Sequence, residues 1–135
     1  LVYKLGGTAR MPDPVPVPEP VLNPPPPFGT PETIARGEQL YGRFCSTCHG
    51  QDGLSRGLFP DLRYAGALGS ADAFKAIVLD GALTQNGMVS FAKALSAQDA
   101  EAVRAYLVAK AVEAKEGRTF ASGTGAPAAP RTHSE

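Results

Sequence analysis

The stretch from Met11 to Pro27, MPDPVPVPEPVLNPPPP, restricts this chain more than any other part of its sequence. Proline fixes the backbone φ angle and removes a hydrogen-bond donor, so this stretch cannot form a helix or a central strand. We expect an extended, semi-rigid segment that reaches roughly 50 Å at about 3.1 Å per residue. It can serve as a disordered tether or as a strap on a neighbouring domain, and the sequence leaves both open. A hydrophobic core must form beyond it.

Three helices are predicted after this stretch, because apolar residues recur there at spacings of three and four. Each is preceded by a residue whose hydroxyl can cap the first turn, namely Thr30, Ser70 and Ser96. We expect the second helix to end at Gly81 and the third at Gly117. Glycine-rich loops over 50–69 and 82–95 join the helices. The sequence therefore predicts an all-α domain over 30–116.

Composition limits what this domain can be. Lys plus Arg and Asp plus Glu both number 13, and this balance argues against a protein that binds nucleic acid through a basic surface. No apolar run is long enough to cross a bilayer. Tryptophan is absent and aromatic residues are few, so the domain needs a covalent staple or a large apolar guest. Residues 117–135 are small and polar and predict a flexible tail.

The two cysteines indicate what that guest is. Cys45-Ser46-Thr47-Cys48-His49 is a C-x-x-C-H motif, which is typical of covalent attachment of c-type haem. In a short helical turn, both thiols and the imidazole project from one side, so the thiols can bond the haem while His49 binds its iron. A thioredoxin-like redox pair requires a β-α setting, and a disulfide leaves His49 unexplained. A zinc site requires four ligands, and the other histidine, His133, lies in the predicted tail.

A methionine is the expected ligand on the opposite face of the haem. Met88 lies in DGALTQNGMVSF, a polar loop where packing explains a methionine poorly, although methionine often fills cores. We interpret Met11 as an incidental residue of the proline-rich stretch. Sulfur ligation by Met88 stabilises reduced iron and leaves no open coordination position. This ligation favours electron transfer over oxygen or peroxide chemistry.

Further residues are candidates for roles around the haem. The carbonyl group of Pro60 can fix the second ring nitrogen of His49, or Pro60 can be a simple turn residue. Arg63 can pair with a haem propionate, or it can be an exposed surface arginine. The apolar residues that can line the haem, or equally form ordinary core, are Leu54, Leu58, Phe59, Leu62, Leu68, Phe74, Ile77, Val78 and Phe91.

These residues together resemble a class I cytochrome c. The resemblance rests on Gly37, Tyr41, Cys45-x-x-Cys48-His49, Pro60-Asp61-Leu62, Gly87-Met88, Val103 and Tyr106-Leu107. It implies a class I cytochrome c fold, with three main helices around a covalently bound haem. It also implies that Gly37 and Tyr41 on the first helix meet Val103 and Tyr106 on the last, where glycine lets the backbones come close. Val89 departs from the family, whose members commonly carry proline after the methionine.

The first residues of the chain resemble the edge of another domain. Residues 1–5, LVYKL, alternate as in a half-buried strand, and no later segment looks like a partner strand. A strand, a proline-rich connector and a cytochrome c together resemble the C-terminal end of quinohaemoprotein alcohol dehydrogenases. That resemblance implies that 1–10 is the remnant of a β-propeller domain, which binds pyrroloquinoline quinone, and that 11–29 is the linker.

On this resemblance the chain is an electron-transfer domain without catalytic residues of its own. It would take electrons singly from the quinone domain and pass them to a cytochrome, a blue-copper protein or an oxidase in the periplasm. We expect a monomer that docks through an apolar patch, since the net charge is zero. A free-standing periplasmic cytochrome c that serves a separate dehydrogenase remains open. A haem sensor or peroxidase is a third class, which requires a vacant sixth position.

Overall fold

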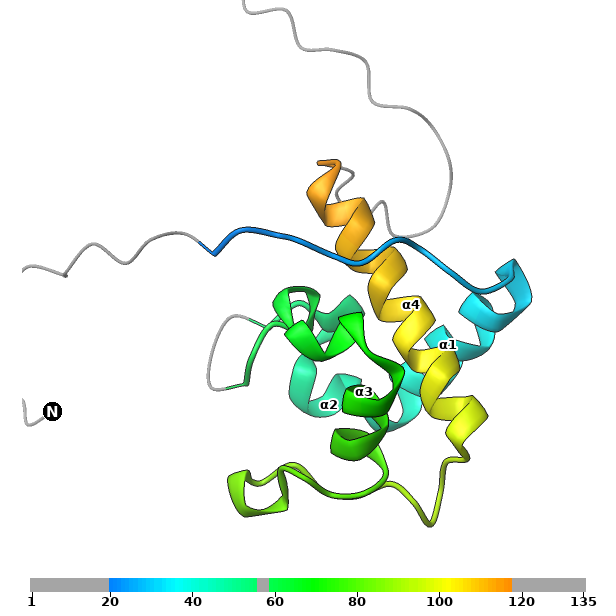
Figure 1. Ribbon diagram of the computed structural model, residues 1–135, viewed down its shortest axis with the longest axis vertical. Coiled ribbons are helices and arrows are strands. Elements are labelled where there is room, and N and C mark those ends of the chain that lie inside the picture. The colour runs from blue at the N-terminus through cyan, green and yellow to red at the C-terminus, as the bar shows by residue number, and fades with distance from the viewer. Residues whose placement is uncertain (1–19, 56–58, 118–135) are drawn as a thin grey trace, which may run out of the picture.

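The computed structural model describes residues 20–55 and 59–117, and these residues are helical (Figure 1). The α-helices are α1 (Pro31–Phe44), α2 (Ser46–His49), α3 (Ala71–Val78) and α4 (Ala97–Lys115). Short 3-10 turns occupy the expected loops: η1 (Gln51–Gly53), η2 (Leu62–Tyr64), η3 (Gly66–Gly69) and η4 (Thr84–Asn86). No strand occurs in the described ranges, so the all-α prediction is confirmed. The predictions for residues 1–19, Leu58 and residues 118–135, which include Met11 and His133, lie outside them.

The three longer helices begin where the hydroxyl residues predict. The side chains of Thr30, Ser70 and Ser96 accept hydrogen bonds from backbone N–H groups three residues onward, at 3.2, 3.2 and 3.1 Å. Helix α3 ends at Val78, before the predicted stop at Gly81. The backbone N–H of Ala82 donates to the carbonyl of Ala76 at 3.0 Å, so the chain turns back over the last helical carbonyls.

Helix α4 is the central element of the fold, because it contributes more buried residues than any other helix in the described ranges. Helix α1 crosses it (Figure 1), and the rings of Tyr41 and Tyr106 pack with centroids 5.5 Å apart. Gly37 lies at the crossing, where a Cβ atom would come within 2.0 Å of the Ala102 carbonyl oxygen and 2.9 Å of Tyr106 Cβ. Only glycine lets the two backbones approach this closely. The buried residues of α4 are Ala100, Ala102, Val103, Ala105, Tyr106, Leu107, Val108 and Ala111.

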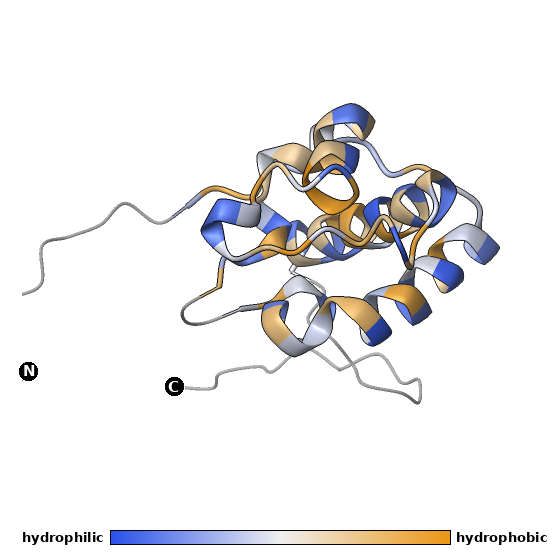
Figure 2. Ribbon diagram, turned by 90° about the horizontal axis from the view of Figure 1, so that it is seen from below, coloured by the Kyte–Doolittle hydropathy of each residue, from blue (hydrophilic) through white to orange (hydrophobic). Residues whose placement is uncertain are grey.

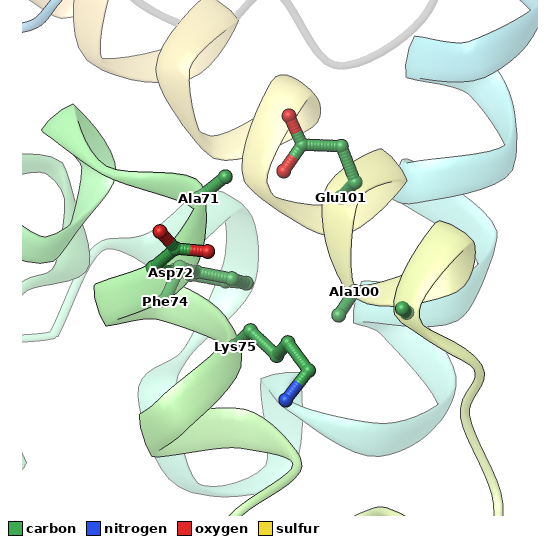
Figure 3. A pocket seen from close by; sticks show the side chains of 7 residues that line it. Ala71, Asp72, Phe74, Lys75, Ala100 and Glu101 are labelled. Carbon is green, nitrogen blue, oxygen red and sulfur yellow. The ribbon is translucent and has the colours of Figure 1, made fainter.

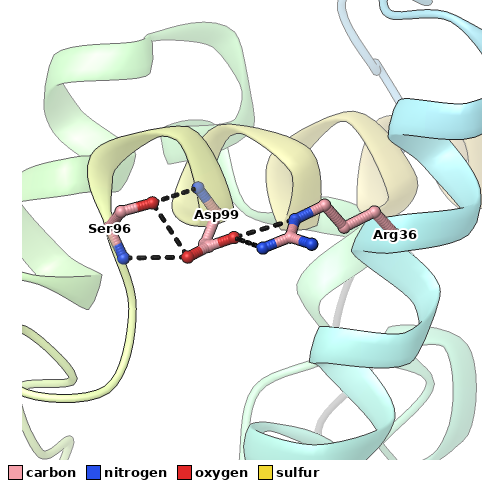
Figure 4. A network of polar contacts seen from close by, with 3 residues as sticks. All are labelled: Arg36, Ser96 and Asp99. Atoms are coloured by element: carbon pink, nitrogen blue, oxygen red, sulfur yellow. Dashed lines mark hydrogen bonds and ion pairs between the residues drawn. The ribbon is translucent and has the colours of Figure 1, made fainter.

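A polar network also ties α1 to α4 (Figure 4). One carboxylate oxygen of Asp99 accepts hydrogen bonds from Arg36 Nε at 2.9 Å and Nη2 at 2.5 Å. The other accepts bonds from the Ser96 backbone N–H at 3.0 Å and its hydroxyl at 2.8 Å. These hydrogen bonds hold the pKa of Asp99 below its usual range. The bond from the Ser96 backbone N–H contributes most, and the bonds from Arg36 and the Ser96 hydroxyl add to it. Asp99 therefore completes the predicted cap of α4 and binds α1 at once.

Residues 20–30 lie on the helical domain itself, where Figure 1 shows them running across α4. The Arg104 guanidinium lies 4.1 Å from the centre of the Phe28 ring, and its Nη1 donates to the carbonyl of Leu68 at 2.7 Å. A Cβ atom on Gly29 would lie 3.3 Å from Ala105 Cβ. Phe28 and Gly29, directly after the proline-rich stretch, thus fasten the chain to the domain that follows.

Polar and apolar residues share the longer helices, as the hydropathy colours of Figure 2 show. Within the described ranges no helix combines the length and the apolar character that crossing a membrane requires.

Replacing Gly37 by alanine should destabilise the fold strongly. The added methyl group would clash with the Ala102 carbonyl, and overpacking of this kind typically costs about 1–3 kcal/mol, occasionally more. Gly42 on the same helix is the control, because nothing lies within 4 Å of a Cβ added there. Gly42→Ala should stabilise by about 0.5–1 kcal/mol. Denaturant unfolding of the haem-loaded chain measures both, and equal stabilities for the two variants would contradict the close crossing.

The variant Asp99→Asn should lose stability at neutral pH, by up to about 1 kcal/mol. Because the folded-state pKa of Asp99 is lowered, its contribution is present above about pH 4 and disappears as the pH falls through the folded value. The gap to wild type should therefore close on acidification. Asp72→Asn, an exposed change in the first turn of α3, is the control. A gap that stays constant down to pH 2 would refute this role of Asp99.

Candidate functional site

The C-x-x-C-H motif forms one helical turn directly after α1. The backbone N–H groups of Cys48 and His49 donate to the Cys45 carbonyl at 3.2 and 3.0 Å. The Ser46 hydroxyl donates to the Gly42 carbonyl at 2.7 Å, which ties the turn to α1. Both cysteines are free thiols, Cys48 exposed and Cys45 half-buried. The turn therefore places Cys45, Cys48 and His49 at successive positions of one helical turn. That their side chains share one side stays a prediction from the spacing.

The Cys45 thiol does not resemble that of a redox cysteine pair. Burial, with a smaller contribution from neighbouring Cys48, raises the pKa of Cys45 to about 11. Reactive C-x-x-C pairs instead have a thiol whose pKa is lowered, because the thiolate is the nucleophile. This difference agrees with the rejection of a thioredoxin-like site.

The imidazole of His49 is buried and held from one side. Its Nδ1 lies 3.4 Å from the carbonyl oxygen of Pro60, a long hydrogen bond, and the ring of Phe59 packs edge-on with centroids 6.0 Å apart. When Nδ1 carries the proton and donates to this carbonyl, the lone pair of Nε2 is available to a metal. The structure thus brings together His49 and Pro60.

Two tyrosines hold the segment that follows His49. The Tyr41 hydroxyl donates to the Gly50 carbonyl at 2.7 Å and accepts from the Gly53 N–H at 3.0 Å, while the Tyr106 hydroxyl donates to the Asp52 carboxylate. Asp52 is buried and has a φ of +57°, a left-handed conformation that aspartate tolerates. Burial raises the pKa of Tyr41 to about 12 and, with Asp52, also raises that of Tyr106. Both hydroxyls therefore stay protonated donors.

The resemblance to class I cytochromes c implied that both tyrosines lie at the helix crossing, but it did not indicate what their hydroxyls do. It also missed Asp52. The available signal was an aspartate between glycines, Gly50 and Gly53, three residues beyond the motif histidine, where the chain must turn sharply.

The loop that carries Met88 has its base beside the motif. Met88 is half-buried, and its backbone N–H donates to the carbonyl of Leu83 at 3.2 Å. The ring of Phe91, three residues later, packs edge-on against Phe44 with centroids 6.0 Å apart. Since Phe44 directly precedes Cys45, this contact joins the loop to the start of the motif turn.

Arg63 is engaged by a neighbouring carboxylate. Its Nε and Nη2 donate to the two oxygens of Asp61 at 2.9 and 2.6 Å, and both side chains are mostly buried. This hydrogen bond to Asp61 raises the pKa of Arg63. Arg63 is therefore not a freely solvated surface residue, and its pairing with a haem propionate stays a prediction.

The apolar residues predicted to line a haem divide into two groups. Leu68, Phe74 and Val78 are buried in the core between the helices. Those left partly uncovered are Leu54, Phe59, Leu62, Ile77 and Phe91, and the neighbouring loop adds exposed Leu83 and Val89. Apolar surface is thus left open in the segments that follow the motif and surround Met88, as a large apolar guest requires.

The donor set fits haem better than zinc. In the ranges 20–55 and 59–117, no three His, Cys, Asp or Glu side chains are grouped to hold a metal ion. Cys45, Cys48 and His49 therefore do not form the compact cage of a structural zinc site. They suit a large planar group that two sulfurs hold at its edge while the imidazole binds the iron.

A small groove between α3 and α4 is separate from these residues (Figure 3). It encloses about 190 Å³ and is lined by Ala71, Asp72, Phe74, Lys75, Ala97, Ala100 and Glu101. Lys75 already pairs with Asp80, and Glu101 with Arg104. Of the residues predicted to surround the haem, only the core residue Phe74 lines it, and none of the predicted ligands does.

Known proteins are similar to this chain in sequence. Residues 32–107 match the family model described as cytochrome c oxidase, cbb3-type, subunit III. The quinohemoprotein alcohol dehydrogenase ADH IIB of Pseudomonas putida is 41% identical over 114 residues, which are 84% of this chain and 16% of that protein. The dehydrogenase subunit of alcohol dehydrogenase (quinone) from Acetobacter aceti is 41% identical over 80 residues, 59% of this chain and 11% of that subunit.

A solved structure agrees with the sequence matches. The quinohemoprotein alcohol dehydrogenase ADHIIG of Pseudomonas putida HK5 superposes with a TM-score of 0.70 at 33% identity, covering 84% of this chain and 16% of that one. The chain thus spans about a sixth of the length of these Pseudomonas relatives.

The variant Tyr106→Phe should destabilise the haem-loaded chain by about 1–3 kcal/mol, because it leaves the buried Asp52 carboxylate without its donor. Tyr64→Phe is the control, since Tyr64 is 39% exposed and its change should stay within about 0.5 kcal/mol. Denaturant unfolding compares the two. Equal losses in both variants would show that the Asp52 contact contributes nothing.

Proposed function

Because this chain belongs to the cytochrome c family whose model matches residues 32–107, we propose that it carries one covalent haem c and transfers single electrons. The observation that carries the proposal is the motif turn. It presents two free thiols and a buried imidazole whose Nδ1 faces a backbone carbonyl. The family description names an oxidase subunit and its model matches residues 32–107, whereas the alcohol dehydrogenase ADH IIB matches 84% of this chain.

Each part of the motif has a distinct task in this proposal. The sulfurs of Cys45 and Cys48 would hold the haem by thioether bonds, and Nε2 of His49 would bind the iron. Pro60 fixes the His49 ring through Nδ1, and the Tyr106–Asp52 contact fixes the segment behind it. When bound, haem supplies an iron centre that accepts and releases one electron at a time. The chain's own residues would hold this centre.

Met88 is the second residue that we propose would bind the haem iron. Its side chain is half-buried on a loop whose base packs against Phe44, the residue before Cys45. A thioether in the sixth position raises the reduction potential and closes the iron to small molecules. Arg63, held by Asp61, is the proposed partner of a propionate group.

The electron donor is proposed to be a quinone-dependent dehydrogenase domain of the same enzyme. The relatives are named as quinohemoprotein alcohol dehydrogenases, and 84% of this chain matches 16% of the first. We assign residues 1–10 to the edge of a β-propeller domain that holds pyrroloquinoline quinone, and 11–29 to the linker. We likewise assign 30–116 to the cytochrome c domain and 117–135 to a C-terminal tail. The whole enzyme would be a periplasmic alcohol oxidoreductase.

The acceptor is proposed to be a separate periplasmic protein, either a cytochrome, a blue-copper protein or an oxidase. Leu83 and Val89 flank Met88 and are 39% and 59% exposed, which gives this loop an apolar surface. With 13 basic and 13 acidic residues, the chain has no net charge to steer a partner from a distance. A monomer docking through this loop suits brief electron-transfer encounters.

A redox titration followed by absorption spectroscopy tests this function. Wild type should show a c-type spectrum, and Met88→Ala should lower the reduction potential and let the reduced protein bind carbon monoxide readily. Met11→Ala is the matched control, because it removes the other methionine and should change neither property. If Met88→Ala behaves as Met11→Ala does, Met88 is not the ligand.

A further inference from the structure

The loop between α3 and α4 is closed at its base by two hydrogen bonds. The last carbonyls of a helix have no partners within it and need others. At the end of α3, the carbonyl of Val78 accepts from the Phe91 N–H at 2.8 Å, and that of Leu79 accepts from the Ser90 hydroxyl. Ser90 and Phe91 therefore bind the carbonyls of Leu79 and Val78, and residues 80–89 form a loop that these two hydrogen bonds close.

Ser90 is held in place from several directions. Its hydroxyl oxygen also accepts from the Ala92 N–H at 3.3 Å, which fixes the side-chain rotamer. On the outgoing side, Gly81 has a φ of +76°, and a Cβ atom there would lie 3.4 Å from Ser90 Cβ. The two ends of the loop thus touch at Gly81 and Ser90.

Met88 lies two residues before this tie. Its backbone N–H donates to Leu83 within the loop, and Gly87 before it has a φ of +90°. Val89, which separates it from Ser90, is 59% exposed and packs little. After Met88, the first hydrogen bond that fastens the loop to the rest of the domain is therefore the one from the Ser90 hydroxyl to the Leu79 carbonyl.

We propose that Ser90 is a positioning residue for Met88. Its bond to the Leu79 carbonyl keeps the loop closed, and the closed loop determines how readily an outside ligand displaces the Met88 sulfur from iron. This inference rests on the proposed function, in which Met88 is the sixth ligand. Displacement requires the loop to open, and the loss of one tie raises the population of the open form.

The test is the rate at which imidazole binds the oxidised, haem-loaded full chain, followed by absorbance. Ser90→Ala should raise this rate about fivefold, the factor that one ordinary hydrogen bond represents. Ser90→Thr keeps the hydroxyl and should stay close to wild type. Ser70→Ala is the matched control, because Ser70 caps the opposite end of α3 by its bond from the Ala73 N–H. It should leave the rate unchanged.

Each outcome supports or overturns the inference. A Ser90→Ala rate equal to wild type overturns it, and so does an equal acceleration by Ser70→Ala, which would indicate a general loosening of α3. Met88→Ala separates the two proposals. If it binds imidazole no faster than wild type, the ligand assignment itself fails; if it binds fast while Ser90→Ala does not, only the role of Ser90 fails. Should Ser90→Ala yield no loaded protein, Ser90→Cys, a weaker donor, serves in its place under the same criteria.

Discussion

The close contact between α1 and α4 is the constraint on which the other parts of this structure depend. Gly37 lies against the Ala102 carbonyl, and this approach lets Tyr41 pack on Tyr106 one turn further along. The hydroxyls of the two tyrosines then fasten the segment after the motif, through the backbone of 50–53 and the Asp52 carboxylate. The contact between α1 and α4 thus fixes the position of the chain directly before the motif turn and directly after it.

The other wall of the proposed haem site is built differently. The loop that carries Met88 has little regular structure, and its position is set by bonds to the end of α3 and by the packing of Phe91 on Phe44. One proposed ligand, His49, therefore lies on a short turn held by the helix crossing, and the other, Met88, lies on a loop held at its base. In this account, opening of the site is a property of the Met88 side, since His49 is buried and bonded.

Local chemistry made the helix starts and the motif predictable. The caps at Thr30, Ser70 and Ser96 act within three residues, so a short stretch of sequence contains all the information. Two local features could not be predicted in this way, namely the early end of α3 and the pairing of Arg63 with Asp61. In each case several hydrogen-bond partners lie close in the sequence, and the sequence does not show which of them forms the bond. The contacts of Asp52 with Tyr106, and of Ser90 with Leu79, join residues 54 and 11 positions apart, which sequence spacing alone does not reveal.

The central claim is that one haem, bonded through Cys45 and Cys48, serves both as the missing part of the core and as the electron carrier. The mass of the intact chain, produced together with haem-attachment machinery and measured after denaturation, tests it directly. The account predicts the polypeptide mass plus one haem, with both cysteines inaccessible to alkylation. A bare polypeptide with two alkylatable thiols would contradict it.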